Sequence, residues 1–576
     1  MIRTYTLGIS WLVASGLLLS MLLGACTGHF DEINTSKTGM TELEPEPIFT
    51  RSLRLGSLDY TYYQRMQQLY VNFYSQYYAN FKEGWYTDSY YYNDEWADYF
   101  WNGNYADKYG SFLSYAHHAA YLSRESDQSK KEACAMIWEV FLLHRVTDIW
   151  GDIPYSQAFG ENISPAFDTQ KQVYEQMLDK LVMALDMLPK EDPNVEWGAA
   201  DILFNDDLGQ WRRFAQSMIL KLAIRVSNVA PEMTMQYIKK MDQYELLQSN
   251  EHSVKMQVMA EGGNERNQNP IMWIDKFDEY RVSKYLVDRL KSLNDPRLEK
   301  MADPVQYYVD QLRSLLSAVH EYADNSVSAD LYTDLERQLI KSYMELLLQR
   351  DGISETGKQG IETIEAFVTS LVERSSSTLL KNKLETFNNE KGELYKGMIN
   401  GVSPDQLVHY EKNRYSRTSS LMIAPDYPTY LYLYAEVCFL QAEACLKGWL
   451  SGNAEQHYQN GIRASMEMFN IGEAEVDDYL RTEAGKLTST NALEQIITQK
   501  WIANINNGFE SWAEYRRTGY PSLYTVPSGG ETGGKMPQRL KYPSTEKTLN
   551  GESVSAATQR IGGDLMTTKL WWAGGK

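Results

Sequence analysis

Cysteine is scarce in this sequence, with 4 residues in 576. Cys134, Cys438 and Cys445 lie in the interior of the chain, and the last two are seven positions apart on one face of a predicted helix. Seven helical residues advance about 10 Å, which is too far for a disulfide within that helix. We interpret all three as buried thiols, so disulfides are not expected to hold the fold together.

Motifs for catalysis, metals and nucleotides are also missing. The sequence has no His-Glu-x-x-His, no Gly-x-Ser-x-Gly and no cysteine pair at metal spacing. The adjacent His117 and His118 would point to different sides of a helix. Residues 529–535 have the glycine and lysine spacing of a phosphate-binding loop, but Met536 replaces the hydroxyl that would hold magnesium. We expect no metal and no cofactor.

Positive charge is in deficit. The 56 Lys and Arg residues face 76 Asp and Glu residues, which gives a formal net charge of -20. A chain of this charge repels phosphate backbones and anionic lipid heads. We therefore expect no nucleic-acid partner.

One long uncharged run, from Thr4 to Ala25, lies at the N-terminus and ends at Cys26. Small residues before a cysteine, after an apolar stretch with Arg3 as its only preceding charge, are typical of a secretory signal with a processing site. The alternative is a retained transmembrane helix, since about 20 apolar residues can span a bilayer. The next charges are Asp31 and Glu32 rather than Lys or Arg, which favours the signal.

Aromatic residues are abundant, with 41 Tyr and 14 Trp against 17 Phe. Tyr and Trp suit positions where one edge of the ring meets water or a polar ligand. From Tyr63 to Phe81 the rings keep helical spacing, which favours a place in the core. Residues 84–96 show no helical or alternating period and contain turn formers, so their rings cannot all face inward. Our candidate ligand-binding residues, each with a place in the core or against a partner as the alternative, are Trp85, Tyr86, Tyr91, Trp96, Trp101 and Asn102.

Helical patterns dominate the rest of the chain, and strand-like alternation is scarce. A capping-box pattern at Thr169 and Gln172 predicts one helix start. The sequence therefore predicts an all-α fold, with a loop-like region over residues 518–550. The other helices are expected over residues 116–145, 209–228, 285–293, 428–447, 454–468 and 491–506, and a Leu-, Glu- and Lys-rich helical insertion over 305–390.

Two charged groups leave alternatives open. Asp148 and Asp152 flank a Gly turn and fit either a cation or acid-base pair, or a structural role as caps of turn amides. Glu514, Arg516 and Arg517 fit either a ligand clamp or a structural ion pair.

Several segments, in order along the chain, resemble the SusD/RagB family of surface lipoproteins of Bacteroidota, which cap an outer-membrane TonB-dependent transporter. Leu23 to Cys26 is similar to the lipobox of bacterial lipoproteins, in which the cysteine is acylated. The segments similar to the family include residues 30–35, 147–156, 211–225, 294–298, 434–444, 499–501, 512–521, 539–543 and 562–572.

The resemblance implies a SusD-like fold with tetratricopeptide-like helical hairpins, no enzymatic activity, and capture of glycans or peptides for a SusC-type transporter at the outer-membrane surface. The motifs define the fold and transfer no ligand residues. We expect a lipid anchor at Cys26 and favour an oligosaccharide as the ligand; the alternatives are a peptide, a surface glycosidase and a purely structural scaffold. The expected organisation is a signal (1–25), a tether (26–47), a helical body (48–304 and 391–576) and the insertion (305–390).

Overall fold

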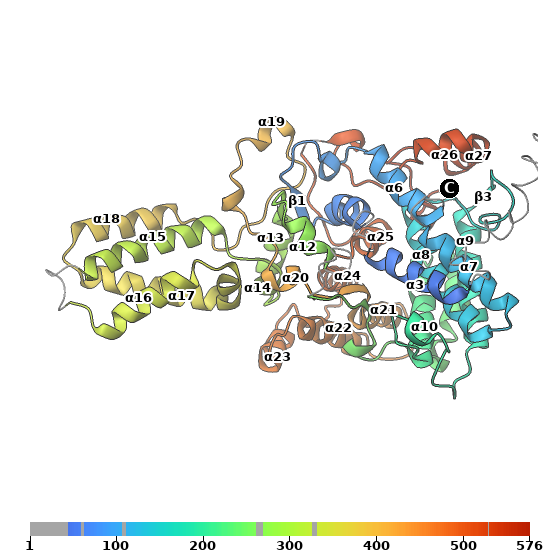
Figure 1. Cartoon of the computed structure of the whole chain (residues 1–576), viewed down its shortest axis with the longest axis horizontal. Helices are drawn as coiled ribbons and strands as arrows, with labels where there is room; N and C mark the ends of the chain where they lie inside the picture. Colours follow the sequence, from blue (N-terminus) through green and yellow to red (C-terminus); the bar gives the residue numbers. More distant parts are fainter. Residues whose placement is uncertain (1–43, 59–62, 106–110, 261–268, 325–330, 528) are drawn as a thin grey trace, which may run out of the picture. The chain divides into compact units, whose positions relative to one another are not determined.

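The computed structural model describes residues 44–58, 63–105, 111–260, 269–324, 331–527 and 529–576. Helices make up most of this part, as the sequence predicts (Figure 1). The predicted all-α fold class is confirmed. In the first half the helices are α3 (Pro45–Leu58), η1 (Tyr63–Val71, a π-helix), α5 (Asn72–Tyr74), η2 (Tyr86–Ser89), α6 (Asp94–Tyr105), α7 (Phe112–Glu125), α8 (Ser129–Trp150), α9 (Gln170–Met187), η3 (Gly198–Ala200), α10 (Leu208–Arg225), α11 (Pro231–Ile238), η4 (Met241–Gln243), η5 (Asn250–His252), α12 (Pro270–Asp275) and α13 (Lys284–Ser292).

The second half begins with the predicted insertion and continues to the C-terminus. Its helices are α14 (Leu298–Met301), α15 (Gln306–Ala323), α16 (Asp334–Leu346), α17 (Arg350–Arg374), α18 (Thr378–Glu390), α19 (Pro404–Leu407), η7 (Lys412–Arg414), α20 (Ser420–Ile423), α21 (Tyr434–Leu446), α22 (Ala454–Met468), α23 (Glu473–Arg481), α24 (Ala492–Ala503), α25 (Gly508–Thr518), η8 (Gly530–Thr532), α26 (Ser544–Leu549), α27 (Gly551–Ile561) and η9 (Trp571–Ala573).

Three antiparallel pairs of short strands join distant parts of the chain. β1 (Tyr78–Asn80) pairs with β5 (Tyr280–Val282), with Tyr78 opposite Val282. β2 (Ile153–Pro154) pairs with β3 (Phe167–Asp168), and β4 (Val254–Met256) pairs with β6 (Thr429–Tyr432). The first pair brings the chain before η2 beside residues from the middle of the sequence.

Local sequence signals explain several helix ends. Thr169 and Gln172 form the predicted capping box at the start of α9, because each side chain bonds the backbone of the other residue. α8 ends at Gly151, whose φ of 91° lies in the region that glycine tolerates. Consecutive helices such as α7 and α8, or α21 and α22, pack as helical hairpins.

The structure corrects four expected boundaries. Residues 116–145 form parts of two helices, α7 and α8, rather than one. Pro428 precedes strand β6 and not a helix, because the helix begins only at Tyr434. The sequence predicts no helix after residue 506, where the structure has α25, and the aperiodic stretch after Trp85 contains the start of α6.

Two large apolar clusters fill the body. The regularly spaced rings Tyr70, Tyr74, Phe73, Tyr77 and Phe81 are all buried, as their helical spacing predicts. Tyr70 and Tyr74 belong to one cluster with α8 and α10, whereas Phe73 and Tyr77 belong to another with α13, α21 and α24. The η1–α5 segment therefore contributes side chains to both clusters.

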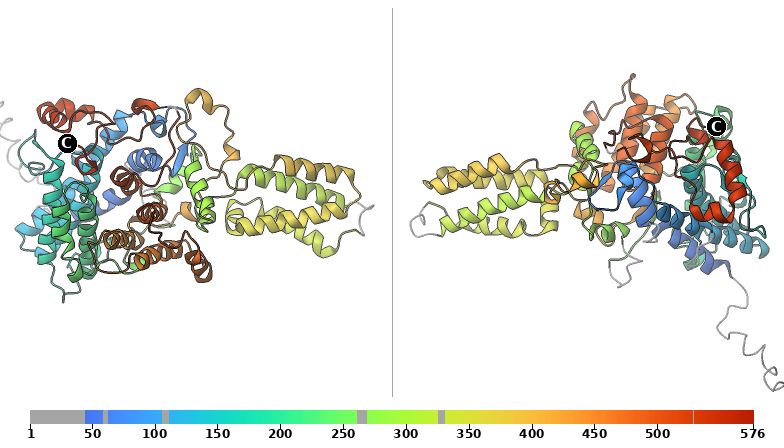
Figure 2. Two further views of the ribbon diagram at one scale, coloured as in Figure 1. Left: turned by 180° about the vertical axis from the view of Figure 1, so that it is seen from behind. Right: turned by 90° about the horizontal axis from the view of Figure 1, so that it is seen from above.

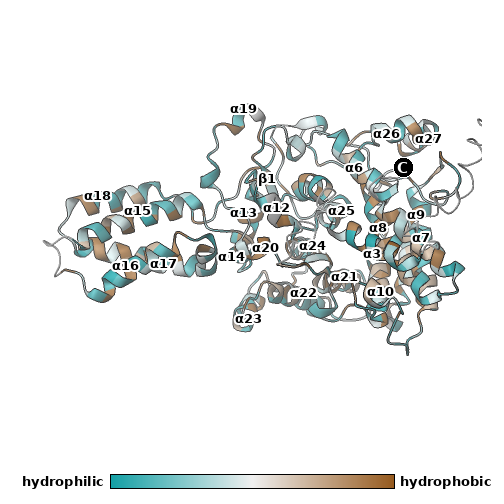
Figure 3. Cartoon of the chain, viewed as in Figure 1, coloured by the Kyte–Doolittle hydropathy of each residue, from teal (hydrophilic) through white to brown (hydrophobic). Residues whose placement is uncertain are grey.

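Residues 306–390 form four helices, α15–α18, that lie side by side in both views of Figure 2. Their apolar faces make a separate core that includes Leu312, Ile364 and Phe387. Hydrophilic and hydrophobic colours alternate along these helices in Figure 3, as expected of amphipathic helices with one buried face. The backbone N–H of Val305 donates to the carbonyl of Leu394 at 2.7 Å, so the two ends of the segment meet.

Arg350 connects this four-helix segment to the rest of the chain. Its guanidinium binds Asp275 at 2.6 Å and Asp303 at 2.7 Å, and it donates to the carbonyl of Thr418. Asp303 is buried, which makes this ion pair part of the packed boundary rather than a surface contact.

The chain divides into two units, Met1–Pro45 and Glu46–Lys576, and the second holds the body described above. The predicted signal, Cys26 and most of the predicted tether lie outside the described residues. α3 begins at Pro45, a position where a first helical turn accepts proline. Cys134 and Cys438 are buried free thiols, as predicted, and Cys445 is half-buried and also free. No helix of the described part combines the length and apolar character needed to cross a bilayer.

Candidate functional site

Four rings between the end of β1 and the first turn of α6 form what we call the aromatic strip: Trp85, Tyr86, Tyr91 and Trp96. Trp85 precedes the short helix η2, and Tyr91 follows it after a left-handed residue, Tyr90, with φ of 62°. The side chain of Asn93 accepts from the backbone N–H of Trp96 at 3.1 Å and so caps the start of α6. The turn and the cap together fix the positions of the four rings.

The rings of the strip pair edge to face. Trp85 and Trp96 have ring centroids 6.2 Å apart at 80°, and Tyr86 and Tyr91 have centroids 6.4 Å apart at 69°. Tyr91 is 46% exposed, and the other three are half-buried. Trp96 also packs against the buried ring of Tyr70, so the strip continues into the core.

Asp88 holds the turn beneath the strip. Its carboxylate accepts from the backbone N–H of Asn80 at 3.0 Å and of Gly401 at 3.2 Å. Burial raises its pKa to about 6, while the hydrogen bonds from Asn80 and Gly401 act in the opposite direction. One side chain thus connects β1, η2 and the loop before α19.

A glycine-rich loop from near the C-terminus supports the same turn. The backbone N–H of Glu531 donates to the carbonyl of Tyr90 at 3.1 Å, and the Glu531 carboxylate accepts from the N–H of Tyr92. A Cβ at Gly530 would lie 2.1 Å from the carbonyl oxygen of Ser89, so only glycine fits. The loop that resembles a phosphate-binding motif in spacing therefore packs against the turn that bears the strip.

Charged side chains stand at one end of the strip. The Lys82 ammonium lies 5.9 Å from the Trp85 ring centroid and 2.5 Å from the Glu279 carboxylate. The pairing of β1 with β5 places Glu279 there, since the N–H of Phe81 donates to its carbonyl. The half-buried Trp85 ring beside a paired cation and carboxylate offers both stacking and hydrogen bonds to a polar ligand.

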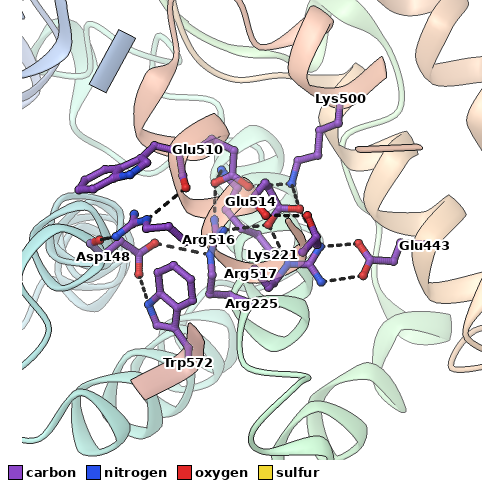
Figure 4. A network of polar contacts seen from close by, with 12 residues as sticks. Asp148, Lys221, Arg225, Glu443, Lys500, Glu510, Glu514, Arg516, Arg517 and Trp572 are labelled. Atoms are coloured by element: carbon purple, nitrogen blue, oxygen red, sulfur yellow. Dashed lines mark hydrogen bonds and ion pairs between the residues drawn. The ribbon is translucent and has the colours of Figure 1, made fainter. Parts of the chain in front are cut away.

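A second charged group lies in the interior (Figure 4). Arg517 binds Glu443 through two bonds of 2.7 and 2.6 Å and also binds Glu514 at 2.7 Å. Arg225 binds Glu510 at 2.6 Å and Glu514 at 2.8 Å. The buried network is defined by Asp148, Lys221, Arg225, Glu436, Glu443, Lys500, Glu510, Glu514, Arg516 and Arg517.

The buried network shifts the pKa values of two of its glutamates in opposite directions. Burial opposes ionisation of Glu514, but the cations Arg517, Lys500 and Arg225 outweigh it and lower the pKa to about 2. Burial raises the pKa of Glu436, and the neighbouring Glu510 raises it further. With all of these side chains buried, the network has no open position for a ligand.

A sequence model of a protein family identifies the family to which this chain belongs. The model described as "Starch-binding associating with outer membrane" matches residues 42–346 and 365–543, most of the chain. The chain belongs to the SusD-like family. The match omits residues 347–364, which span the start of α17 within the four-helix segment.

Solved structures agree with this assignment. A chitin-binding protein matches with 25% identity and a TM-score of 0.70, covering 92% of this chain and 100% of its own. A chitin-binding SusD homolog from Flavobacterium johnsoniae matches with 24% identity and a TM-score of 0.66, covering 92% and 97%. A SusD homolog from Bacteroides vulgatus matches with 23% identity and a TM-score of 0.66, covering 89% and 93%. No curated protein matches the chain.

In this SusD-like chain the predicted site residues fall into two groups. Trp85, Tyr86, Tyr91 and Trp96 form the strip, whereas Trp101 is 1% exposed and donates through its indole N–H to Glu546 at 3.1 Å. Trp101 therefore packs in the core against α26 and is left out of the proposed ligand surface.

Asn102 is half-buried on α6, where its amide donates to Asp98 at 2.9 Å. Among the described residues, no hydrogen bond or ring contact joins Asn102 to the strip. Sequence reasoning missed Lys82, Glu279 and Glu531, which the structure brings to the strip or its turn. Only Lys82 could have been recognised from local sequence, because it lies three positions before Trp85. Glu279 and Glu531 are distant in sequence and reach the strip or its turn through long-range backbone contacts.

The paired aspartates serve the fold. Asp148 accepts from the Tyr174 hydroxyl at 2.5 Å and the Trp572 indole N–H at 2.9 Å, and it is buried. Asp152 accepts from the backbone N–H of Gln170 at 2.9 Å and from Arg560. Both residues thus have structural partners, but only Asp152 bonds a backbone amide as expected, whereas Asp148 bonds the side chains of Tyr174 and Trp572.

Metal-ligand clusters are absent from the described residues, where no three His, Cys, Asp or Glu side chains are placed to share an ion. His117 lies 3.3 Å from Glu139, and His118 stacks on Tyr121. The two imidazoles therefore have separate partners.

Proposed function

We propose that this SusD-like protein binds an oligosaccharide at the aromatic strip and passes it to a SusC-type transporter in the outer membrane. The observation that carries the proposal is the aromatic strip, in which Tyr91 is exposed and the other three rings are half-buried, in a chain whose family is described as starch-binding and associated with the outer membrane. Two solved relatives are described as chitin-binding, which supports a glycan over a peptide as the ligand.

The geometry of the strip suits a sugar chain. The apolar faces of sugar rings stack on Trp and Tyr, and the hydroxyls bond to charged and amide groups nearby. Tyr91 and Trp85 supply ring faces, while Lys82 and Glu279 supply a donor and an acceptor at one end. The edge-to-face pairs keep the rings in place before a ligand arrives, which lowers the entropic cost of binding.

The proposal includes a lipid anchor and excludes catalysis. An acylated Cys26 would hold the body at a membrane, because each buried CH₂ contributes about 0.8 kcal/mol.

We propose binding without cleavage, since the paired aspartates that suggested acid-base chemistry are occupied by structural partners. Incubating the protein with polysaccharides and assaying new reducing ends tests this directly.

Binding of chitin and malto-oligosaccharides, measured by calorimetry on Trp85→Ala and Tyr91→Ala variants, tests the strip. We expect Kd to rise about 3- to 10-fold in each, as loss of one aromatic contact costs about 0.5–1.5 kcal/mol. Trp96→Ala should weaken binding similarly but also lower stability, since Trp96 packs on Tyr70.

Tyr121→Ala is the matched control, because Tyr121 is 42% exposed on α7 outside the strip. Its affinity should equal that of the unaltered protein. Unchanged affinity in Trp85→Ala and Tyr91→Ala would remove the strip as the site. Binding of peptides but no glycan would overturn the ligand class.

A further inference from the structure

A cleft of about 300 Å³ opens between residues 241–248 and the α21–α22 hairpin. It shares no lining residue with the strip. In Figure 1, α6 lies at the top of the body and α22 at the bottom, so the two sites are on separated elements. A volume of about 300 Å³ is at the lower end of the range for small-molecule sites.

The lining of the cleft carries no formal charge, although the chain as a whole has a net charge of -20. Burial lowers the pKa of His457, so its imidazole is neutral at pH 7. The lining combines an apolar part, formed by Met241, Leu246, Leu247, Cys438 and Leu450, with the Ser451 hydroxyl and with side-chain amides and rings: Gln248, Gln441, Asn460, Tyr244, Tyr434 and His457.

The side-chain amides in the cleft lining have donors and acceptors that are not paired within the described part of the protein. Among the described residues, no hydrogen bond joins the side-chain amides of Gln248 and Gln441 to another protein group. Asn460 accepts from Gln456 at 3.0 Å through its side-chain oxygen, which leaves its NH₂ group as a donor. Both donors and acceptors are thus available around one small space.

This combination selects for one class of ligand. A charged ligand would lose hydration without meeting an opposite charge, and a purely apolar one would leave the amides unpaired. Sugar hydroxyls both donate and accept, as amides do, and sugar faces stack on the Tyr rings.

We propose that the cleft between residues 241–248 and α21–α22 is a second saccharide site, which takes a neutral mono- or disaccharide unit. The lining of the cleft alone defines this site, independently of the strip. A long oligosaccharide or two separate molecules could be held at both places, which would raise the effective affinity of the surface for a polymer.

The test uses the mature chain carrying Trp85→Ala, so that binding at the strip is weakened, and labelled with ¹³C-methyl methionine. Met241 is buried and lines the cleft, and its resonance is assigned by Met241→Leu. Titration with maltose, cellobiose and N,N′-diacetylchitobiose should shift this methyl signal saturably for at least one sugar. Glucuronic acid should produce no shift.

Two substitutions of lining residues test whether the sugar binds in the cleft. Gln441→Leu removes a half-buried amide, and Ser451→Trp blocks the opening from an exposed lining position. Each should weaken the sugar-dependent shift at least tenfold, whereas Gln243→Ala, on an exposed neighbour outside the lining, should leave it unchanged.

Three results would overturn the proposal: no Met241 shift with any neutral sugar, a shift that persists in Ser451→Trp, or a shift produced only by a peptide. Failure of the strip is recognised separately. In that case Trp85→Ala and Tyr91→Ala leave oligosaccharide affinity unchanged whatever happens at Met241.

Discussion

Asp88 is the side chain on which the geometry of the strip depends most directly. It is buried, and its carboxylate bonds two backbone amides from segments far apart in the sequence. Its folded pKa, about 6, lies above the ordinary value of 3.8. The unfolded chain therefore releases this proton at lower pH than the folded chain.

This difference predicts a pH dependence of stability. As pH rises from about 3 to about 7, the contribution of Asp88 to the free energy of unfolding should fall by about 3 kcal/mol, since each unit of pKa corresponds to about 1.4 kcal/mol. Asp88→Asn removes the titration. Urea unfolding at pH 4, 5, 6 and 7 should show the free energy of unfolding of the variant rising relative to that of the unaltered protein. A difference that stays constant over these pH values would contradict the pKa shift.

Glu514 and Glu436 should respond differently to neutralisation. Glu514 has a pKa lowered to about 2 by its cations, so its charge stabilises the fold above pH 4.5, and this stability is lost as pH falls towards 2. Glu514→Gln should cost about 3 kcal/mol at pH 7, because it leaves buried cations short of a partner. Thermal or urea unfolding measures the loss.

Glu436→Gln is the matched comparison within the same network. Burial raises the pKa of Glu436, so its charge contributes less, and we expect a loss below about 1 kcal/mol. Equal losses of unfolding free energy in the two variants would contradict the opposite pKa shifts of Glu514 and Glu436.

Single residues show how far the site could be predicted from sequence. The spacing of Tyr70 and Tyr77 was enough to predict their burial. The aperiodic stretch after Trp85 correctly suggested rings outside a regular core pattern, but the aromatic density hid the helix start at Asn93. The burial of Trp101 depends on Glu546, 445 positions away, and no local pattern contains that information.

At the scale of elements, we expect that helices α15–α18 can be deleted without unfolding the rest of the protein. Their core is separate, and Val305 and Leu394 already meet through a backbone hydrogen bond. Replacing residues 306–392 with a short Gly-Ser turn should leave a folded protein whose affinity at the strip changes less than about twofold. Circular dichroism, urea unfolding and calorimetry give these readouts.

The deletion should include Asp303→Asn, because removal of Arg350 would otherwise leave a buried carboxylate without its cation. Arg350→Ala in the full chain is the control and should cost about 3 kcal/mol for the same reason. An unfolded deletion variant that carries Asp303→Asn would show that the body depends on the four helices.

Helices and strands differ in how far their own residues determine the structure that they adopt. The capping box at Thr169 is local and was predicted correctly. β6 could not be, because its four residues become a strand only through pairing with β4, some 170 positions earlier. α25 was hidden by charged residues that look solvent-exposed in sequence but neutralise one another in the buried network.

At the scale of the whole molecule, attachment to the membrane is proposed to rest on Cys26. Cys26→Ala should shift the protein from the membrane fraction to the soluble fraction, because no acyl chain could then be added. Fractionation with immunoblotting measures this. Cys134→Ala, at a buried free thiol, is the control and should remain with the membrane.

The support that Gly530 and Glu531 give to the turn around Tyr90 also sets an order of events during synthesis. The rings of the strip are made early, but the backbone that braces them emerges only with about the last fifty residues of the chain. A product cut short before Gly529 would carry every ring of the strip and still lack that brace. We therefore expect such a shortened product to bind poorly at the strip that we propose as the ligand site.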